Sequence, residues 1–283
     1  MNYCHAFHAG GFADVIKHSV LARILVHLRS KPAAFRVIDT HAGAARYDLA
    51  GTAASRTEEW RDGIARLAAV RLEGEVAALL APYLEVVAKF NRGERLVAYP
   101  GSPEIARAAM RPHDRLVACE LERDAARALS RSLARDDRVK VVAIDGWLAL
   151  TAYVPPKERR GLVFVDPAFE QSDEFSRMAD RFAAAHRKWP SGIYVLWYPI
   201  KRHGEPVALA RRLERLAIAK ILCAEVAVAK ARDGERLTGC GLVIVNPPWT
   251  LERELKIMLP VLATILARDG KGTARLDWLA GEK

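Results

Sequence analysis

The chain has 283 residues, 51% of them hydrophobic, so it can bury the core of one sizeable domain without disulfides. Its formal net charge of +10 at pH 7 favours a polyanionic partner such as a nucleic acid. Neither a long apolar segment nor a secretory signal is visible, and the four cysteines lack CxxC spacing. We therefore expect a cytoplasmic protein with reduced thiols and no membrane association.

Polar side chains crowd the N-terminal segment. His5 and His8 have a spacing that could suit a metal, but no further ligand set accompanies them, so we expect no metal site. Lys17 and His18 begin a predicted helix with an apolar face from Val20 to Leu28. On its own, this pair is equally typical of the polar start of a helix.

Short apolar runs that alternate with helical stretches predict an α/β fold, a doubly wound parallel sheet with helices on both faces. The expected strands are 35–39, 116–120, 140–144, 162–165, 193–197, 221–229 and 241–245. The last two are joined by a polar segment containing Asp233-Gly234, which predicts a terminal antiparallel hairpin.

The first two strands end about 80 residues apart, whereas a simple strand-helix-strand unit needs roughly 30. The excess carries helical signals, including a capping box at Ser55 and Glu58. We therefore predict an inserted helical subdomain over 46–99 and a sheet domain made of 1–45 and 100–283. The insertion is a candidate RNA platform, although core packing explains its apolar helix faces equally well.

Ligands bind open α/β sheets beyond the carboxyl ends of the strands. The segment 39–46 is a small-residue turn without the full GxGxxG signature, which speaks against NAD and also fits a plain tight turn. Glu120 could accept both hydroxyls of a ribose or supply a charge at the start of the next helix. Asp145 could accept from an adenine amino group beside Gly146, which leaves space for the ring, or could form an Asx-type turn.

The fourth strand ends in Asp166-Pro167-Ala168-Phe169. A carboxylate and a backbone carbonyl that accept both hydrogens of an exocyclic amine can draw that weak nucleophile toward tetrahedral geometry. Proline holds the carbonyl, and the aromatic ring can stack on an extruded base. These residues indicate amino-methyl transfer on a nucleobase; the alternative is a strand-ending turn with a packed Phe169.

Asn246-Pro-Pro-Trp249 matches the amino-methyltransferase tetrapeptide better than the segment at Asp166 does. It follows the last predicted strand, however, and no cofactor motif lies at the matching spacing. We expect it to close the terminal hairpin, and we expect Asp166 to carry the chemistry.

Together, these motifs resemble the bacterial 23S ribosomal RNA adenine-N6 methyltransferases of the RlmJ type. The matching segments span nearly the whole chain and include 5–18, 39–43, 99–103, 192–199 and 246–249. The resemblance implies a Rossmann-like class I methyltransferase fold with an inserted helical subdomain. It also implies methyl transfer from S-adenosylmethionine, which leaves as S-adenosylhomocysteine, to the N6 amino group of adenine 2030 in 23S rRNA. We expect a monomer.

The resemblance also assigns roles to individual residues. The cofactor contacts would be His18, His41, Ser102, Glu120, Asp145, Gly146 and Asp166. The catalytic residues would be Asp166, Pro167 and Phe169, and the substrate contacts would be Tyr3, Lys17 and Phe169. Ser102 also fits a helix N-cap before Pro103.

Alternatives stay open, and two departures from the family pattern bear on one of them, the non-catalytic module. Ala45 stands where a second glycine is usual, and Ala168 and Phe169 stand where a proline and a tyrosine are usual. The alternatives are an enzyme of the same chemistry that acts on DNA, and a non-catalytic RNA-binding module that retains a cofactor pocket.

Overall fold

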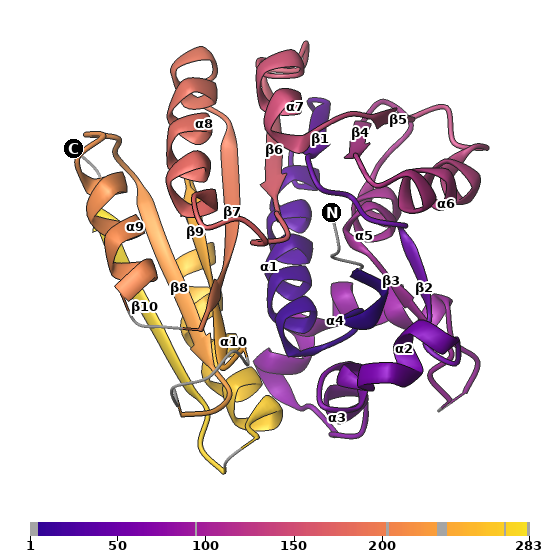
Figure 1. Ribbon diagram of the computed structural model, residues 1–283. Helices are drawn as coiled ribbons and strands as arrows, with labels where there is room; N and C mark the ends of the chain where they lie inside the picture. The colour runs from indigo at the N-terminus through magenta and orange to yellow at the C-terminus, as the bar shows by residue number, and fades with distance from the viewer. Residues whose placement is uncertain (1–4, 94, 202–203, 231–236, 269, 282–283) are drawn as a thin grey trace.

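An eight-stranded sheet runs through the molecule in the order β10-β8-β9-β7-β6-β1-β4-β5 (Figure 1). The computed structural model describes residues 5–93, 95–201, 204–230, 237–268 and 270–281. The strands are β1 (Phe35–Asp39), β4 (Arg115–Glu120), β5 (Val139–Ala143), β6 (Arg160–Val165), β7 (Ile193–Ile200), β8 (Ile221–Ala227), β9 (Gly239–Val245) and β10 (Thr273–Ala280). Strands β5, β4, β1, β6 and β7 pair in parallel, which confirms the predicted parallel core.

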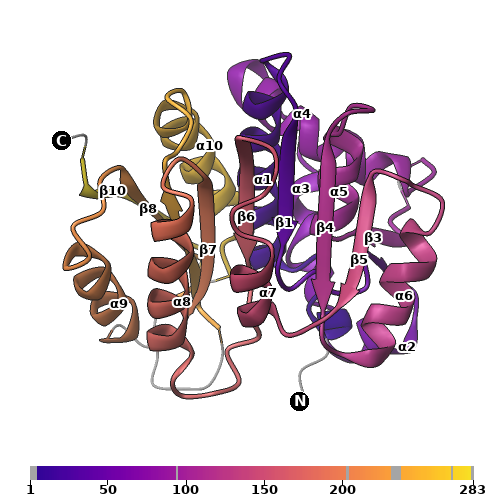
Figure 2. The ribbon, with the colours of Figure 1, turned by 90° about the horizontal axis from the view of Figure 1, so that it is seen from above.

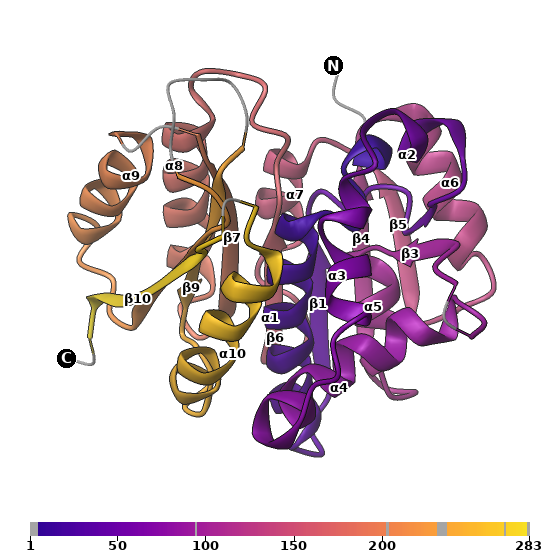
Figure 3. The same ribbon diagram turned by 90° about the horizontal axis from the view of Figure 1, so that it is seen from below.

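Helices cover both faces of the sheet, as the alternating pattern predicted (Figures 2 and 3). One apolar core joins the sheet to α1 (Phe12–Arg29), α5 (Ser102–Ala109), α6 (Arg123–Leu133) and α10 (Leu251–Leu266). A second core joins the other face to α7 (Gly146–Ala152), α8 (Glu174–Lys188) and α9 (Gly204–Glu214). No helix in the described ranges is long and apolar enough to cross a membrane.

The segment 46–99 leaves the sheet and returns to it. Its ends pair as two short antiparallel strands, β2 (Arg46–Asp48) and β3 (Ala98–Pro100). Between them lie α2 (Thr52–Thr57), η2 (Glu59–Arg61), α3 (Ile64–Ala68) and α4 (Gly74–Lys89), and α4 packs against α1 and α10. The expected capping box is wrong, because Ser55 lies within α2 and Glu58 lies at its C-terminal end.

The predicted hairpin is confirmed, since β8 and β9 pair antiparallel with Ile221 opposite Val245. Its Asp233-Gly234 turn lies outside the described residues. The expectation that this hairpin ends the fold is wrong, because α10 and β10 follow and β10 pairs antiparallel with β8. Strand β10 was missed because it is a partly exposed edge strand without a continuous apolar run.

Asn246 lies at the sheet edge opposite the carboxyl ends of the parallel strands, because β9 runs antiparallel to β7. Its side-chain amide donates to the carbonyls of Pro190 and Gly192, at 2.7 and 2.8 Å. The Asn246-Pro-Pro-Trp249 segment therefore ties β9 to the start of β7, far from the ends of β1, β4, β5 and β6.

Candidate active site

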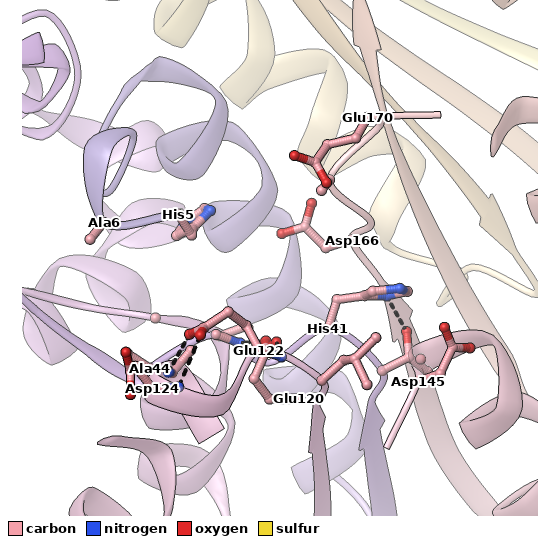
Figure 4. Close-up of a pocket in the computed structure, with 18 of the residues that line it drawn as sticks. His5, Ala6, His41, Ala44, Glu120, Glu122, Asp124, Asp145, Asp166 and Glu170 are labelled. Atoms are coloured by element: carbon pink, nitrogen blue, oxygen red, sulfur yellow. Dashed lines mark hydrogen bonds between the residues drawn. The ribbon is translucent and has the colours of Figure 1, made fainter. Parts of the chain in front are cut away.

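A pocket of about 330 Å³ opens beyond the carboxyl ends of β1, β4, β5 and β6 (Figure 4). It lies where the strand order reverses around β1, which is the usual ligand position in a doubly wound sheet. In Figure 4, His41 lies between Asp166 and Glu120. The predicted residues that line the pocket are His18, His41, Ser102, Glu120, Asp145, Gly146 and Asp166.

The turn after β1 is fixed by both neighbouring strands. The Thr40 amide donates to the carbonyl of Phe164 at 3.0 Å, and the Ala42 amide donates to the carbonyl of Cys119 at 2.9 Å. Gly43 has a φ of 62°, and a Cβ there would lie 2.0 Å from the Tyr47 hydroxyl. The buried Ala45 has a φ of 64°, a left-handed conformation that favours glycine and accounts for the glycine usual at this position.

The carboxylate of Glu120 is oriented by backbone amides. Its Oε2 accepts from the Gly43 amide and its Oε1 from the Glu122 amide, both at 2.8 Å. Each oxygen can accept one further hydrogen bond. The alternative role at the helix start belongs instead to Glu122, which caps α6 by accepting from the amides of Asp124 and Ala125.

Asp145 caps α7, since its Oδ1 accepts from the amides of Trp147 and Leu148 at 2.9 and 3.0 Å. The expected turn-forming role of Asp145 therefore uses only Oδ1, and Oδ2 stays available to a ligand. A Cβ on Gly146 would lie 2.4 Å from the Thr40 carbonyl and 2.5 Å from Nε2 of His41. Glycine is needed there because α7 approaches the β1 turn so closely, and Gly146 also lines the pocket, where the adenine ring is expected.

Asp166 meets a buried ammonium group from α1. The Lys17 Nζ lies 2.6 Å from Oδ2 of Asp166 and 2.6 Å from Oδ1 of Asp14. Burial lowers the pKa of Lys17, but the two carboxylates outweigh burial and raise that pKa above its ordinary value. Lys17 is only 3% exposed and lies behind Asp166, outside the pocket lining.

Asp14 is a buried acid that sequence reasoning did not assign to the site. Besides Lys17, it accepts from the Gly10 amide at 2.8 Å, and its Oδ2 lies 3.2 Å from Nε2 of His5. Burial raises the pKa of Asp14, yet Lys17 and His5 together hold it well below its usual value. The three-residue spacing of Asp14 and Lys17 in the first helical turn was the signal available for this pair.

Phe169 lies beside the pocket rather than in its lining. Its ring centroid is 4.7 Å from that of Phe175 and 5.8 Å from that of Trp197. Its backbone is left-handed, with a φ of 52°. Pro167 is buried, and Tyr3 lies outside the described residues.

Three histidines line the pocket; His5 contacts Asp14, and the other two, His18 and His41, are neutral at pH 7. Burial lowers the pKa of His18 to about 3 and that of His41 to about 4. Nδ1 of His18 lies 2.7 Å from the Tyr99 hydroxyl, which in turn lies 3.0 Å from that of Tyr83 in α4. These bonds tie the pocket wall to the segment 46–99.

Ser102 begins α5 one residue inside the cap position, which Gly101 occupies, so its expected N-cap role is wrong. Its hydroxyl interacts with Asp39. Asp39 is 1% exposed, and its Oδ1 has no hydrogen-bond partner among the described residues. Burial raises the pKa of Asp39 to about 7, although the Ser102 hydroxyl acts in the opposite direction and lowers it.

The pocket is acidic in a basic protein, which suits a cationic ligand. Seven carboxylates and one arginine line it, namely Glu120, Glu122, Asp124, Asp145, Asp166, Glu170, Glu174 and Arg177. Sequence reasoning missed Glu170, which directly follows the Asp166 tetrapeptide, and Glu174 and Arg177 in α8. His5 and His8 contact separate acids, Asp14 and Glu59, and the described ranges hold no group of three or more residues suited to a metal ion.

The sequence and the fold were compared with those of known proteins. Residues 32–280 match the family described as Ribosomal RNA large subunit methyltransferase D, RlmJ. Two proteins named Ribosomal RNA large subunit methyltransferase J, from Escherichia coli and Haemophilus influenzae, are 38% and 36% identical, with full coverage of both chains. A crystal structure of a Legionella pneumophila protein is 33% identical with a TM-score of 0.87, covering 96% of this chain and 98% of that one.

Proposed function

Because the chain belongs to the RlmJ family of ribosomal RNA large subunit methyltransferases, we propose that it transfers a methyl group from S-adenosylmethionine to the N6 amino group of an adenine in 23S rRNA. The observation that carries this proposal is Asp166-Pro167 at the end of β6, beside an acidic pocket at the reversal point of the sheet. The fold is that of a class I methyltransferase.

The pocket fits this cofactor in size and charge. About 330 Å³ lies within the usual range for ligand pockets. The cofactor would supply an electrophilic methyl group on a cationic sulfur. Seven carboxylates favour such a cation, and burial keeps His18 and His41 from adding opposing charges.

Residues at different strand ends would bind different parts of the cofactor. Glu120 would accept the ribose hydroxyls, because the amides of Gly43 and Glu122 already fix its carboxylate. Oδ2 of Asp145 would accept from the adenine amino group, while Oδ1 stays bound to α7. Ser102 and Gly146 would support the β1 turn beneath the cofactor, through Asp39 and His41 respectively.

Asp166 and the Pro167 carbonyl would hold the target amine. Lys17 holds Oδ2 of Asp166, which leaves Oδ1 to accept one amine hydrogen, and the carbonyl would accept the other. Holding the amine in line with the methyl group would accelerate the transfer by positioning. Asp166 or water would take the proton that the amine releases. Lys17 therefore acts on the substrate through Asp166, as a positioning residue.

Phe169 and Tyr3 would lie near the target base. For its ring to stack on that base, Phe169 would have to leave its contacts with Phe175 and Trp197. RNA is favoured over duplex DNA because loop bases are already unstacked and cost less to extrude. We propose a cytoplasmic monomer in which 46–99 forms a subdomain inserted into the sheet domain.

The test is transfer of labelled methyl groups by the purified protein to naked 23S rRNA fragments, alongside an adenine-containing DNA duplex. The proposal predicts labelling of the rRNA alone. Labelling of the duplex would favour the DNA enzyme. Cofactor binding without labelling of rRNA from a strain that lacks the enzyme would favour the non-catalytic module.

A further inference from the structure

The elements α4, β3 and α5 lie side by side (Figure 3). A groove of about 680 Å³ lies between α5 on one side and the end of α4 and strand β3 on the other. Four cationic side chains and one carboxylate line it, and they come from four parts of the chain. These are Arg46 in β2, Lys89 at the end of α4, Glu104 and Arg107 in α5, and Arg138 before β5. The groove is therefore basic, in contrast to the acidic pocket.

Carboxylates offset part of this charge, but the four cations still outnumber Glu104 and Asp136. Glu104 is buried and is bridged by two guanidinium groups, Arg46 at 3.1 Å and Arg107 at 2.7 Å. Arg138 is held in place by Asp136 and by the Met110 carbonyl. The side chain of Arg46 stays 47% exposed, and Lys89 is exposed.

Arg46 is held in a fixed position at the centre of this surface. Its guanidinium carbon lies 4.5 Å from the centroid of the Phe90 ring, a cation–π contact, and its backbone pairs with Pro100. A planar guanidinium held in this way presents its remaining N–H groups in the fork that matches a phosphate.

The groove and the active site are linked by a chain of shared lining residues. A second hollow of about 620 Å³ shares Arg46 and Ala98 with the groove and adds the exposed Arg131 of α6. The same hollow shares Tyr47 and Ala128 with the cofactor pocket. An RNA strand that leaves the pocket along this path would pass five cations, and one exposed carboxylate, Asp48, lies beside Arg46 in the second hollow.

We propose that this groove, formed by Arg46, Lys89, Arg107, Arg131 and Arg138, binds the sugar-phosphate backbone of the RNA that flanks the target adenine. The inference rests on the proposed function. The seven carboxylates of the pocket repel phosphates, so the polyanion must be held outside it, and the groove is a cationic surface linked to it by shared lining residues. Guanidinium groups and an ammonium group are the usual partners of nucleic-acid phosphates.

The test compares RNA affinity across salt concentrations for wild type and Lys89→Gln/Arg131→Gln, with a 23S rRNA fragment that wild type methylates. Each lost phosphate contact should flatten the plot of log affinity against log salt by about 0.7, so the double variant should flatten it by about 1.4. Near 150 mM salt, its affinity should fall about tenfold. Cofactor affinity and the rate at saturating RNA should stay unchanged.

The matched control is Arg71→Gln/Lys256→Gln, which removes the same charge from exposed sites outside the groove. Arg71 precedes the opposite end of α4 from Lys89, about 24 Å away along the helix. Equal losses of RNA affinity in both double variants would mean that only net charge matters. Unchanged RNA affinity in the groove variant would point to another partner, such as an acidic protein. Either result would refute RNA binding by the groove while leaving the proposed function intact. Absence of rRNA methylation by wild type would refute the proposed function itself.

Discussion

Replacing Lys17 by methionine should strongly destabilise the protein. The ammonium group lies 2.6 Å from Asp14 and 2.6 Å from Asp166, so each pair contributes a gross attraction of about 6 kcal/mol at an effective dielectric of about 20. Much of this offsets the desolvation of a lysine that is 3% exposed. Losing the cation would leave two carboxylates uncompensated, and breaking such a buried pair costs about 3–5 kcal/mol.

The assay is chemical denaturation of both proteins, with thermal unfolding as a second readout. We expect a loss of about 3–5 kcal/mol and a melting temperature lower by roughly 10 °C. Because Lys17 holds the pKa of Asp14 well below its usual value, the deficit should shrink in acid, where Asp14 takes up a proton. Methyl transfer should also fail, since Asp166 loses the group that holds it.

Lys256→Met is the matched control. Its ammonium also lies 2.6 Å from a carboxylate, that of Glu252, but its side chain is 62% exposed. Water screens this pair, so its loss should cost under about 1 kcal/mol. If Lys17→Met cost no more than Lys256→Met, the burial argument would be refuted.

Three further predictions concern the strand ends. Asp166→Asn should abolish methyl transfer to rRNA with the cofactor still bound, whereas Asn246→Ala should leave transfer largely intact; equal losses would refute the assignment. Asp39, whose pKa burial raises from 3.8 to about 7, keeps a proton that the unfolded chain releases. Its contribution to the free energy of unfolding is fully present below pH 3.8 and is lost as the pH rises through 7, by up to about 4 kcal/mol. Chemical denaturation of Asp39→Asn at a series of pH values should lack this pH dependence. Gly146→Ala places a Cβ 2.4 Å from the Thr40 carbonyl, so titration calorimetry should give at least roughly tenfold weaker cofactor binding and denaturation a loss of about 1–3 kcal/mol; wild-type values would contradict the packing argument.

The sheet could be predicted from the sequence because most of its strands are buried on both faces and read as apolar runs. Strand order also separated the two candidate tetrapeptides, since Asn246 ends an antiparallel strand and Asp166 a parallel one. Strand β10 could not be predicted in the same way, because an edge strand is exposed and its apolar residues are scattered.

From the residues alone, the site was predictable only at the strand ends, whereas His18 in α1 and Ser102 in α5 were assigned through the family resemblance. Glu120, Asp145 and Asp166 each follow or end a parallel strand, and register brings them to one edge. The contact between Lys17 and Asp166 joins residues 149 positions apart, and local sequence carries no signal for it. The place of Phe169 in an aromatic cluster likewise depends on Phe175 and Trp197, which tertiary packing brings together.

The central claim is methyl transfer to one adenine of 23S rRNA at the Asp166 site. The most direct measurement is mass-spectrometric mapping of 23S rRNA from a strain that lacks the enzyme, after incubation with purified protein and S-adenosylmethionine. The account predicts N6-methyladenine at a single nucleotide with wild type and none with Asp166→Asn. A methyl group on another base or atom, or an unchanged yield with Asp166→Asn, would contradict it.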